Sequence, residues 1–226
     1  DMIGDPLDMI ASGPAYPDAS TSEEAVAIAE KYGLTLTEEM WMLLKQETPK
    51  ELHNVQTQIT GSVRQLCQSA EETCRALGYK PMVLTASMRC NARDAGSFLA
   101  SIAQYHADTK TSLAFIAGGE TVVRLTGKGK GGRNQEIALA AAEEIAGIPG
   151  AAVFSLGSDG TDGPTDAAGG YCDSQTREKL AAQGILIPTV LQNNDAYNAL
   201  AKCDGLLITG PTGTNVNDVS ILLIKR

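Results

Sequence analysis

The chain has 226 residues, of which 43% are hydrophobic, 20% charged and 4% aromatic, so the composition indicates a globular protein with an ample core and argues against disorder. A formal net charge of −9 makes the bulk surface repel nucleic acid and anionic membranes, and we expect neither as a partner. No apolar run approaches the roughly 18 residues of a membrane span. The five cysteines form no CxxC pair, which predicts a reducing, cytoplasmic location without a zinc site.

The first half of the chain shows a regular alternation of helices and strands. Ser or Thr residues stand before several apolar-periodic segments and glycines follow them, as expected at helix ends. These signals predict helices over 22–32, 38–46, 62–77 and 92–107, with short strands over 53–60 and 81–86. Strand, helix, strand, helix is the order of a parallel sheet.

The pattern changes near residue 111. Two strand-like segments, 112–117 and 120–126, meet at Gly118–Gly119 and predict a tight hairpin. The remaining predicted elements are a helix over 133–146, a buried strand over 151–156, a helix over 174–183, and strands in "GLLITG" and "VSILLIKR". We therefore expect two α/β units with a boundary near residue 110.

A basic, glycine-rich loop, "GKGKGGRNQE" at 127–136, precedes the helix predicted from residue 133. Its four glycines let backbone amides converge, the following helix turns its positive end toward them, and Lys128, Lys130 and Arg133 add cations. These are the parts of an anion or phosphate site, although neither a Walker A loop nor G-x-G-x-x-G can be aligned here. The alternative is a flexible, solvated loop.

An acidic loop follows the predicted strand 151–156 and carries Asp159, Asp162 and Asp166 among glycines. Ligands of open α/β sheets bind at the carboxyl ends of strands. One or two of these carboxylates, together with substrate phosphate oxygens, suit Mg²⁺, or one of them could act as general base toward a substrate hydroxyl. Turn and helix capping by the aspartates is the alternative.

Two further features offer polar groups with less specificity. The loop "TGPTGTNVND" at 209–218 presents Thr212, Thr214 and Asn215 directly after a predicted buried strand, although most such loops are merely turns. Glu120 is a single acid at the predicted hairpin and, taken alone, reads as an ordinary strand residue.

Five motifs taken together resemble one family. They are "GDPLDMIASGP" (4–14), "GGETVV" (118–123), "GKGKGGRNQEIALAAA" (127–142), "SDGTDGPTDAAGG" (158–170) and "TGPTGTNVNDV" (209–219). In this order they resemble the class II glycerate kinases, whose C-terminal module is the MOFRL domain. The resemblance implies ATP- and Mg²⁺-dependent phosphorylation of D-glycerate to 2-phosphoglycerate, in a cleft between two α/β domains. Relatives are often labelled hydroxypyruvate reductase, but the chain has no Rossmann fingerprint for a nicotinamide cofactor.

The resemblance implies roles for the charged loops. Asp159, Asp162 and Asp166 would face the cleft, with Asp159 and Asp166 holding Mg²⁺ and Asp162 or Asp159 accepting the glycerate hydroxyl proton. Arg133 would grip the glycerate carboxylate or a phosphate with its planar fork.

The other implied contacts are with substrate hydroxyls, phosphate and the pocket wall. Orientation of substrate hydroxyls would fall to Glu120, Asn134 and Glu136. Phosphate would be bound by Lys128, Lys130, Gly131 and Gly132. The pocket wall would be closed by Thr212, Thr214 and Asn215.

The expected fold class is α/β, a partial Rossmann-like parallel-sheet segment followed by a MOFRL-type domain. On this reading residues 1–110 are the C-terminal portion of a first domain, residues 111–226 are the MOFRL-type domain, and the rest of the N-terminal domain is a missing partner. The alternative is a non-catalytic ligand-binding or oligomerisation module, and a homodimer is one of the oligomeric states left open.

Overall fold

The computed structural model describes residue 4, residues 6–10, residue 13 and residues 15–226, and part of the motif at 4–14 lies outside the described residues. The described chain divides into two compact units, one ending at Thr60 and one running from Gly61 to Arg226. The division does not fall near residue 110, because strand 80–88 pairs with strand 113–119 in one sheet. The division of sequence modules near residue 110 stays a prediction.

The smaller unit contains two short helices, α1 (Ser22–Lys31) and α2 (Glu38–Leu44), which confirm two predicted helices. Thr21 and Glu24 form a capping box at the start of α1. The hydroxyl of Thr37 accepts a hydrogen bond from the Met40 amide at the start of α2. The strand predicted over 53–60 is wrong, since these residues have no regular structure.

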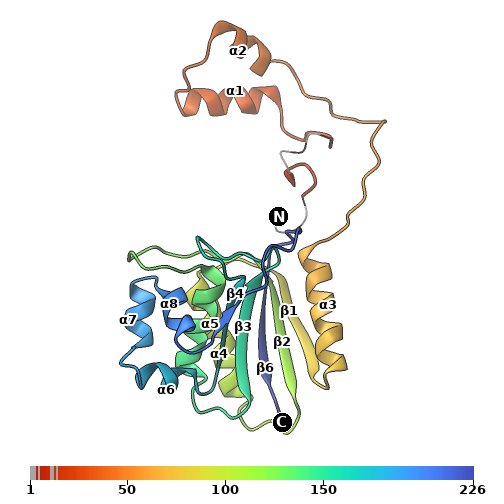
Figure 1. Ribbon diagram of the computed structural model, residues 1–226. Coiled ribbons are helices and arrows are strands. Elements are labelled where there is room, and N and C mark those ends of the chain that lie inside the picture. The colour runs from red at the N-terminus through yellow and green to blue at the C-terminus, as the bar shows by residue number, and fades with distance from the viewer. Residues whose placement is uncertain (1–3, 5, 11–12, 14) are drawn as a thin grey trace. The chain divides into compact units, whose positions relative to one another are not determined.

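The larger unit is built on a six-stranded mixed sheet in the order β1-β2-β6-β3-β4-β5 (Figure 1). The strands are β1 (Lys80–Met88), β2 (Leu113–Gly119), β3 (Ala151–Gly157), β4 (Gly169–Asp173), β5 (Leu206–Leu207) and β6 (Asp218–Ile224). β1 and β2 are parallel and are joined by a helical crossover. The parallel arrangement was predicted for segments 53–60 and 81–86, and only the second of these is a strand. All other pairings between these strands are antiparallel.

Helices cover both faces of this sheet. They are α3 (Val63–Ala76), α4 (Ala92–Tyr105), α5 (Arg133–Glu144), α6 (Thr176–Ala181), α7 (Ile187–Gln192) and α8 (Ala196–Ala201). One face is covered by α3, and the opposite face by α4 and α5, with the three short helices packed around α5 (Figure 1).

The strands in the middle of the sheet are buried on both faces, so their side chains alternate between two cores. Ile116 and Ile221 pack on the α3 side. Phe115 and Leu222, their chain neighbours, pack on the side of α4 and α5. This two-sided burial explains the nearly continuous apolar runs in β2 and β6.

The predicted hairpin at Gly118–Gly119 is wrong. Residues 120–126 contain only an isolated bridge between Asn91 and Val122, and the antiparallel neighbour of β2 is β6. The strand expected in "GLLITG" shortens to β5, and β4, α7 and α8 were not predicted. Their short length and the two glycines of β4 leave little periodic signal.

One edge of the sheet collects the segments that matter for function. Met88, at the end of β1, pairs with Gly119 at the end of β2. Gly119 and Gly157, at the ends of β2 and β3, both pair with Asp218 at the start of β6. The loops that leave these strands are therefore neighbours. Among the described helices, none combines the length and apolar character needed to cross a membrane.

Candidate functional site

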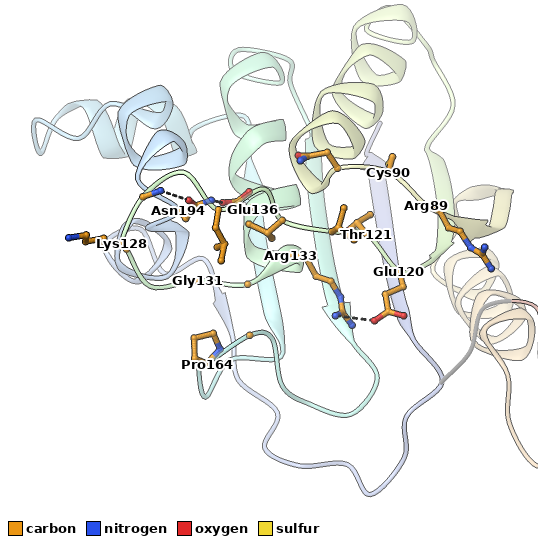
Figure 2. Close-up of a pocket in the computed structure, with 18 residues that line it drawn as sticks. Arg89, Cys90, Glu120, Thr121, Lys128, Gly131, Arg133, Glu136, Pro164 and Asn194 are labelled. Carbon is orange, nitrogen blue, oxygen red and sulfur yellow. Dashed lines mark hydrogen bonds and ion pairs between the residues drawn. The ribbon is translucent and has the colours of Figure 1, made fainter. Parts of the chain in front are cut away.

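A pocket of about 1050 Å³ opens at this edge of the sheet. Its lining is drawn from segments 89–91, 120–125, 127–133 and 163–164, with additions from α5 and the α7–α8 turn. Figure 2 shows Arg133 turned toward Glu120 on one side and Asn194 turned toward Glu136 on the other. The predicted basic loop and the start of α5 thus form one wall of the largest pocket that we describe.

The basic loop is rich in glycine because it lies against the turn that joins α7 to α8. A Cβ added at Gly127 would stand 2.3 Å from the Cα of Asn193, and one at Gly129 would stand 2.4 Å from the Cβ of Asp195. Real side chains do not approach so closely, so these positions must be glycine for packing reasons. The glycines do not by themselves indicate a bound phosphate.

The same turn accepts hydrogen bonds from five successive amides of the loop. Asn194 Oδ1 accepts from the amides of Thr126 and Gly127 at 2.7 and 2.9 Å. Asn193 accepts from Lys128 through its side chain and from Gly129 through its carbonyl, and Asp195 Oδ1 accepts from Lys130. The amides of residues 126–130 are therefore not available to a ligand.

The next three amides, those of residues 131–133, are not bound by this turn. Within the part of the chain that we describe, the backbone N–H groups of Gly131, Gly132 and Arg133 have no hydrogen-bond partner. All three residues line the pocket. Because they begin α5, the positive end of the helix dipole lies beside them. Only the last residues of the loop therefore have amides that are open to a ligand, and anion binding there stays a prediction.

Asp162 does not line the pocket but lies beneath the loop, 3% exposed. Its two carboxylate oxygens accept the amides of Asn134 (3.1 Å) and Gln135 (2.9 Å), so a residue from a distant loop caps α5. Burial raises the pKa of Asp162 to about 6, against the lowering effect of these two amides and of Arg133. The geometry does not favour the predicted catalytic role and instead gives Asp162 a structural one.

Arg133 already has partners for its planar fork. Its Nε and Nη2 donate to the two oxygens of Asp218 at 2.5 and 3.0 Å, and its Nη1 lies 3.2 Å from Glu120 Oε1. The hydrogen bonds to Asp218 raise the pKa of Arg133 above its ordinary value. The predicted clamp on a substrate carboxylate therefore conflicts with the bidentate pair to Asp218, although the guanidinium still faces the pocket.

Of the acids and amides predicted to orient substrate hydroxyls, only Glu120 is accessible; it also accepts a hydrogen bond from Asn217. Asn134 is fully buried and accepts a hydrogen bond from Ser155. Glu136 is 1% exposed and is bound by Arg93 and Asn194. Neither buried side chain favours the predicted contact with substrate.

The predicted metal ligands, Asp159 and Asp166, have different hydrogen-bond partners. Asp159 accepts the amide of Thr161 within its own turn. Asp166 accepts the Tyr197 hydroxyl at 2.7 Å, and this bond lowers the pKa of Asp166. The described residues contain no group of three or more His, Cys, Asp or Glu side chains placed to hold a metal ion. The three aspartates of the acidic loop therefore serve separate local contacts.

The two lysines of the basic loop have different surroundings. Lys128 lines the pocket. The ammonium of Lys130 instead lies 3.9 Å from the centre of the Tyr197 ring, a cation–π contact. Of the two lysines predicted to bind phosphate, the geometry favours Lys128.

The loop at 209–217 packs against the acidic loop rather than the pocket. The Thr212 hydroxyl donates to the Ser158 carbonyl at 2.5 Å and accepts from the amide of Thr214. Thr212, Thr214 and Asn215 are absent from the pocket lining. The predicted pocket wall is therefore not formed by these residues within the larger unit.

Sequence reasoning missed Asp218, Asn194 and Tyr197. Asp218 is 3% exposed and stands at the start of β6, where nothing in the local sequence separates it from a turn residue. Asn194 carries a left-handed φ of 53°, and the pair Asn193–Asn194 was the one available signal for it, since asparagine is enriched in that conformation.

The helices α4 and α5 start at one edge of a mixed sheet, beside a pocket with both apolar and charged lining residues. This is an arrangement in which α/β proteins bind small ligands. The MOFRL family matches residues 113–218, and a domain of unknown function (DUF4147) matches residues 1–45. The chain is 50% identical over 99% of its length to the D-glycerate 2-kinase of Thermotoga maritima, covering 55% of that protein. It is 40% identical to the glycerate 2-kinase of Pyrococcus horikoshii, covering 99% of this chain and 54% of that protein.

The crystal structure of glycerate kinase from Thermotoga maritima superposes with a TM-score of 0.96 at 50% identity, covering 100% of this chain and 55% of that one. The chain belongs to the class II glycerate kinase family. It spans about half the length of these relatives.

Proposed function

We propose that this chain forms the MOFRL-containing portion of an ATP-dependent D-glycerate 2-kinase, which yields 2-phosphoglycerate. Two relatives named as glycerate 2-kinases match 99% of the chain at 50% and 40% identity, and this carries the proposal. The five unpaired cysteines support a cytoplasmic location.

The start of α5 supports an anionic ligand. The three unpartnered amides of Gly131–Arg133 and the ammonium of Lys128 line one pocket in a protein whose net charge is −9. A carboxylate or phosphoryl group placed there would receive backbone hydrogen bonds at the positive end of a helix dipole. Glycerate and ATP both carry such groups, and phosphoryl transfer depends on their neutralisation and alignment.

The residues keep revised roles in this proposal. Gly131 and Gly132 offer amides, Lys128 neutralises anionic charge, and Glu120 with Arg133 orients the substrate at the pocket mouth. Mg²⁺ would enter with ATP, bound to its phosphate oxygens. One or two protein carboxylates would then suffice to complete its ligands. Asp159 accepts the Thr161 amide and Asp166 the Tyr197 hydroxyl, and each carboxylate would have a further oxygen to offer this ion.

The first test is a paired assay on the longest natural form of the protein. One arm follows ADP release with ATP, Mg²⁺ and D-glycerate, and the other follows NADH oxidation with hydroxypyruvate. We expect ADP release that requires glycerate. NADH oxidation without ADP release would contradict the proposal and favour a reductase, whereas silence in both arms would favour a non-catalytic ligand-binding module.

A matched pair of lysine variants tests the pocket. Lys128→Gln removes one cation from the pocket lining, and Lys110→Gln makes the same charge change at an exposed position away from the pocket. We expect the first to raise the KM for ATP or glycerate roughly fivefold or more, since a hydrogen bond to a charged group contributes about 1.5–3 kcal/mol. Equal KM values in the two variants would remove Lys128 from the site.

A further inference from the structure

The turn between α7 and α8, residues 193–195, makes many hydrogen bonds to the basic loop for a connection of three residues. Its central residue, Asn194, is 5% exposed and adopts a φ of 53°. The side chain of Asn194 accepts from two loop amides with Oδ1 and donates from Nδ2 to the Arg124 carbonyl (3.1 Å) and to Glu136 Oε1 (2.7 Å). A strained backbone conformation is thus retained where one amide side chain satisfies four groups.

These contacts connect two parts of the pocket wall. Oδ1 holds the segment around Thr126 and Gly127, which leads into the basic loop. Nδ2 holds Glu136, which lies in the first turns of α5 and is also fixed by Arg93. The side chain of Asn194 therefore joins the entrance of the loop to the helix that ends it, and Figure 2 shows it beside Glu136 in the pocket wall.

Besides this turn, α8 also holds the loop, through the Tyr197 amide on the Lys130 carbonyl and the Tyr197 ring beside the Lys130 ammonium. The glycines of the loop impose little conformation of their own, and a free loop would populate many backbone states. The hydrogen bonds from residues 126–130 to the turn select one of these states. That state places Lys128 and the open amides of Gly131–Arg133 along the same pocket.

We propose that Asn194 is a positioning residue, which fixes the basic loop on α5 so that Lys128 and the amides of Gly131–Arg133 present one preorganised surface to an anionic ligand. For its kinetic readout this inference rests on the proposed glycerate kinase function. Its structural readout does not, because it concerns only the order of the loop. Asn194 touches no reacting atom in this scheme and acts through the groups that it places.

The test variant is Asn194→Gly, because glycine adopts the left-handed conformation without a penalty while the side chain is lost. The matched control is Asp204→Gly, at an exposed turn with a φ of 56° that does not line the pocket. Both are made in the longest natural form of the protein. Amide hydrogen exchange, the KM for ATP and for glycerate, kcat and the affinity for 2-phosphoglycerate by calorimetry are measured for each.

In Asn194→Gly we expect the amides of Thr126 and Gly127 to exchange about two- to tenfold faster, since each loses one hydrogen bond. We expect 2-phosphoglycerate to bind about tenfold more weakly, the KM of the anionic substrate at this wall to rise by a similar factor, and kcat to change less. The control should match the unaltered protein.

Faster exchange limited to the loop, with unchanged affinity and KM, would overturn the inference, because Asn194 would then be merely structural. So would exchange that rises equally throughout α5 and the sheet. If Asn194→Gly does not fold, Asn194→Asp keeps the Oδ1 acceptor, removes the donor to Glu136 and to the Arg124 carbonyl, and places a second carboxylate beside Glu136. We expect weaker binding of 2-phosphoglycerate together with faster exchange of the loop amides, and unchanged binding or unchanged exchange overturns the inference. Absence of glycerate turnover in the unaltered protein would refute the proposed function alone, since exchange and 2-phosphoglycerate binding need no turnover.

Discussion

Substitution of Gly132 by alanine is a direct test of how Asp162 caps α5. A Cβ at Gly132 would stand 2.3 Å from the Asp162 Cγ and 2.4–2.5 Å from its two oxygens. The backbone of Gly132 is extended, with φ −139° and ψ 179°, so alanine brings no conformational strain there. Any loss of stability therefore reports the steric conflict with the carboxylate.

The geometry sets the size of the effect. Ordinary contact needs a separation of roughly 3.4 Å, so the carboxylate must move by about 1 Å. That displacement lengthens its hydrogen bonds to the amides of Asn134 and Gln135 beyond useful range. Loss of a helix cap costs about 0.5–2 kcal/mol and overpacking about 1–3 kcal/mol. We expect Gly132→Ala to lower the free energy of unfolding by about 2–4 kcal/mol, or to lower Tm by roughly 5–15 °C.

Urea and thermal unfolding followed by circular dichroism measure this change, with Gly131→Ala as the neighbouring control. A Cβ at Gly131 would meet its nearest atoms, in Ala196 and Tyr197, at 3.3–3.4 Å, so its cost should stay within about 0.5 kcal/mol. In an Asp162→Ala background the cost of Gly132→Ala should nearly vanish. Equal stability of the two single variants would refute the capping geometry.

Two further predictions concern Arg133, which lines the pocket, and Asp162, which lies beneath the basic loop. Arg133→Lys keeps the charge but loses the two-bond pair to Asp218, so we expect the free energy of unfolding to fall by about 1–3 kcal/mol; a raised KM for glycerate at unchanged stability would instead favour the oxyanion clamp. The pKa of Asp162 rises from 3.8 to about 6 on folding, so the folded state binds this proton more tightly and the contribution of Asp162 to stability falls as pH rises from about 4 to 6. Relative to Asp162→Asn, the unaltered protein should lose up to roughly 3 kcal/mol over that interval and show no further difference above it; parallel pH profiles in urea unfolding would contradict the raised pKa.

Local signals predicted the long helices and the central strands well. The helix α3 begins at the cap Ser62 and ends before Gly78, and its apolar positions recur at helical spacing. The helix α5 and the strands β1, β3 and β6 were also found within a few residues of their bounds. Each of these elements carries its own periodicity, so no distant contact is needed to recognise it.

The errors in the sheet have two causes. The segment after Gly119 has strand-like residues, but β6, from the end of the chain, takes the place beside β2 that the hairpin would have used. Strand pairing between distant segments cannot be read from local pattern, and β4 and β5 are too short to give one.

The sequence alone indicated which kinds of residue surround the site and that it lies at the start of the helix from residue 133. Glycines, lysines and Arg133 before a strong helix predicted an anion-binding wall, and the pocket does lie at the start of α5. The motif order also predicted the glycerate kinase family, which the comparisons confirm. The first conclusion needed only local composition, whereas the second needed the resemblance of five motifs to a known family.

Only the tertiary structure decided what each group in the site contacts. The turn at 193–195 accepts the amides of residues 126–130, Asp162 caps α5, and Asp218 takes the fork of Arg133. Each partner is far away in sequence, and a buried polar group must take whichever partner the fold brings within hydrogen-bond distance. A sequence can therefore show which polar groups are available, whereas the packing of distant loops determines which of them stay open to a ligand.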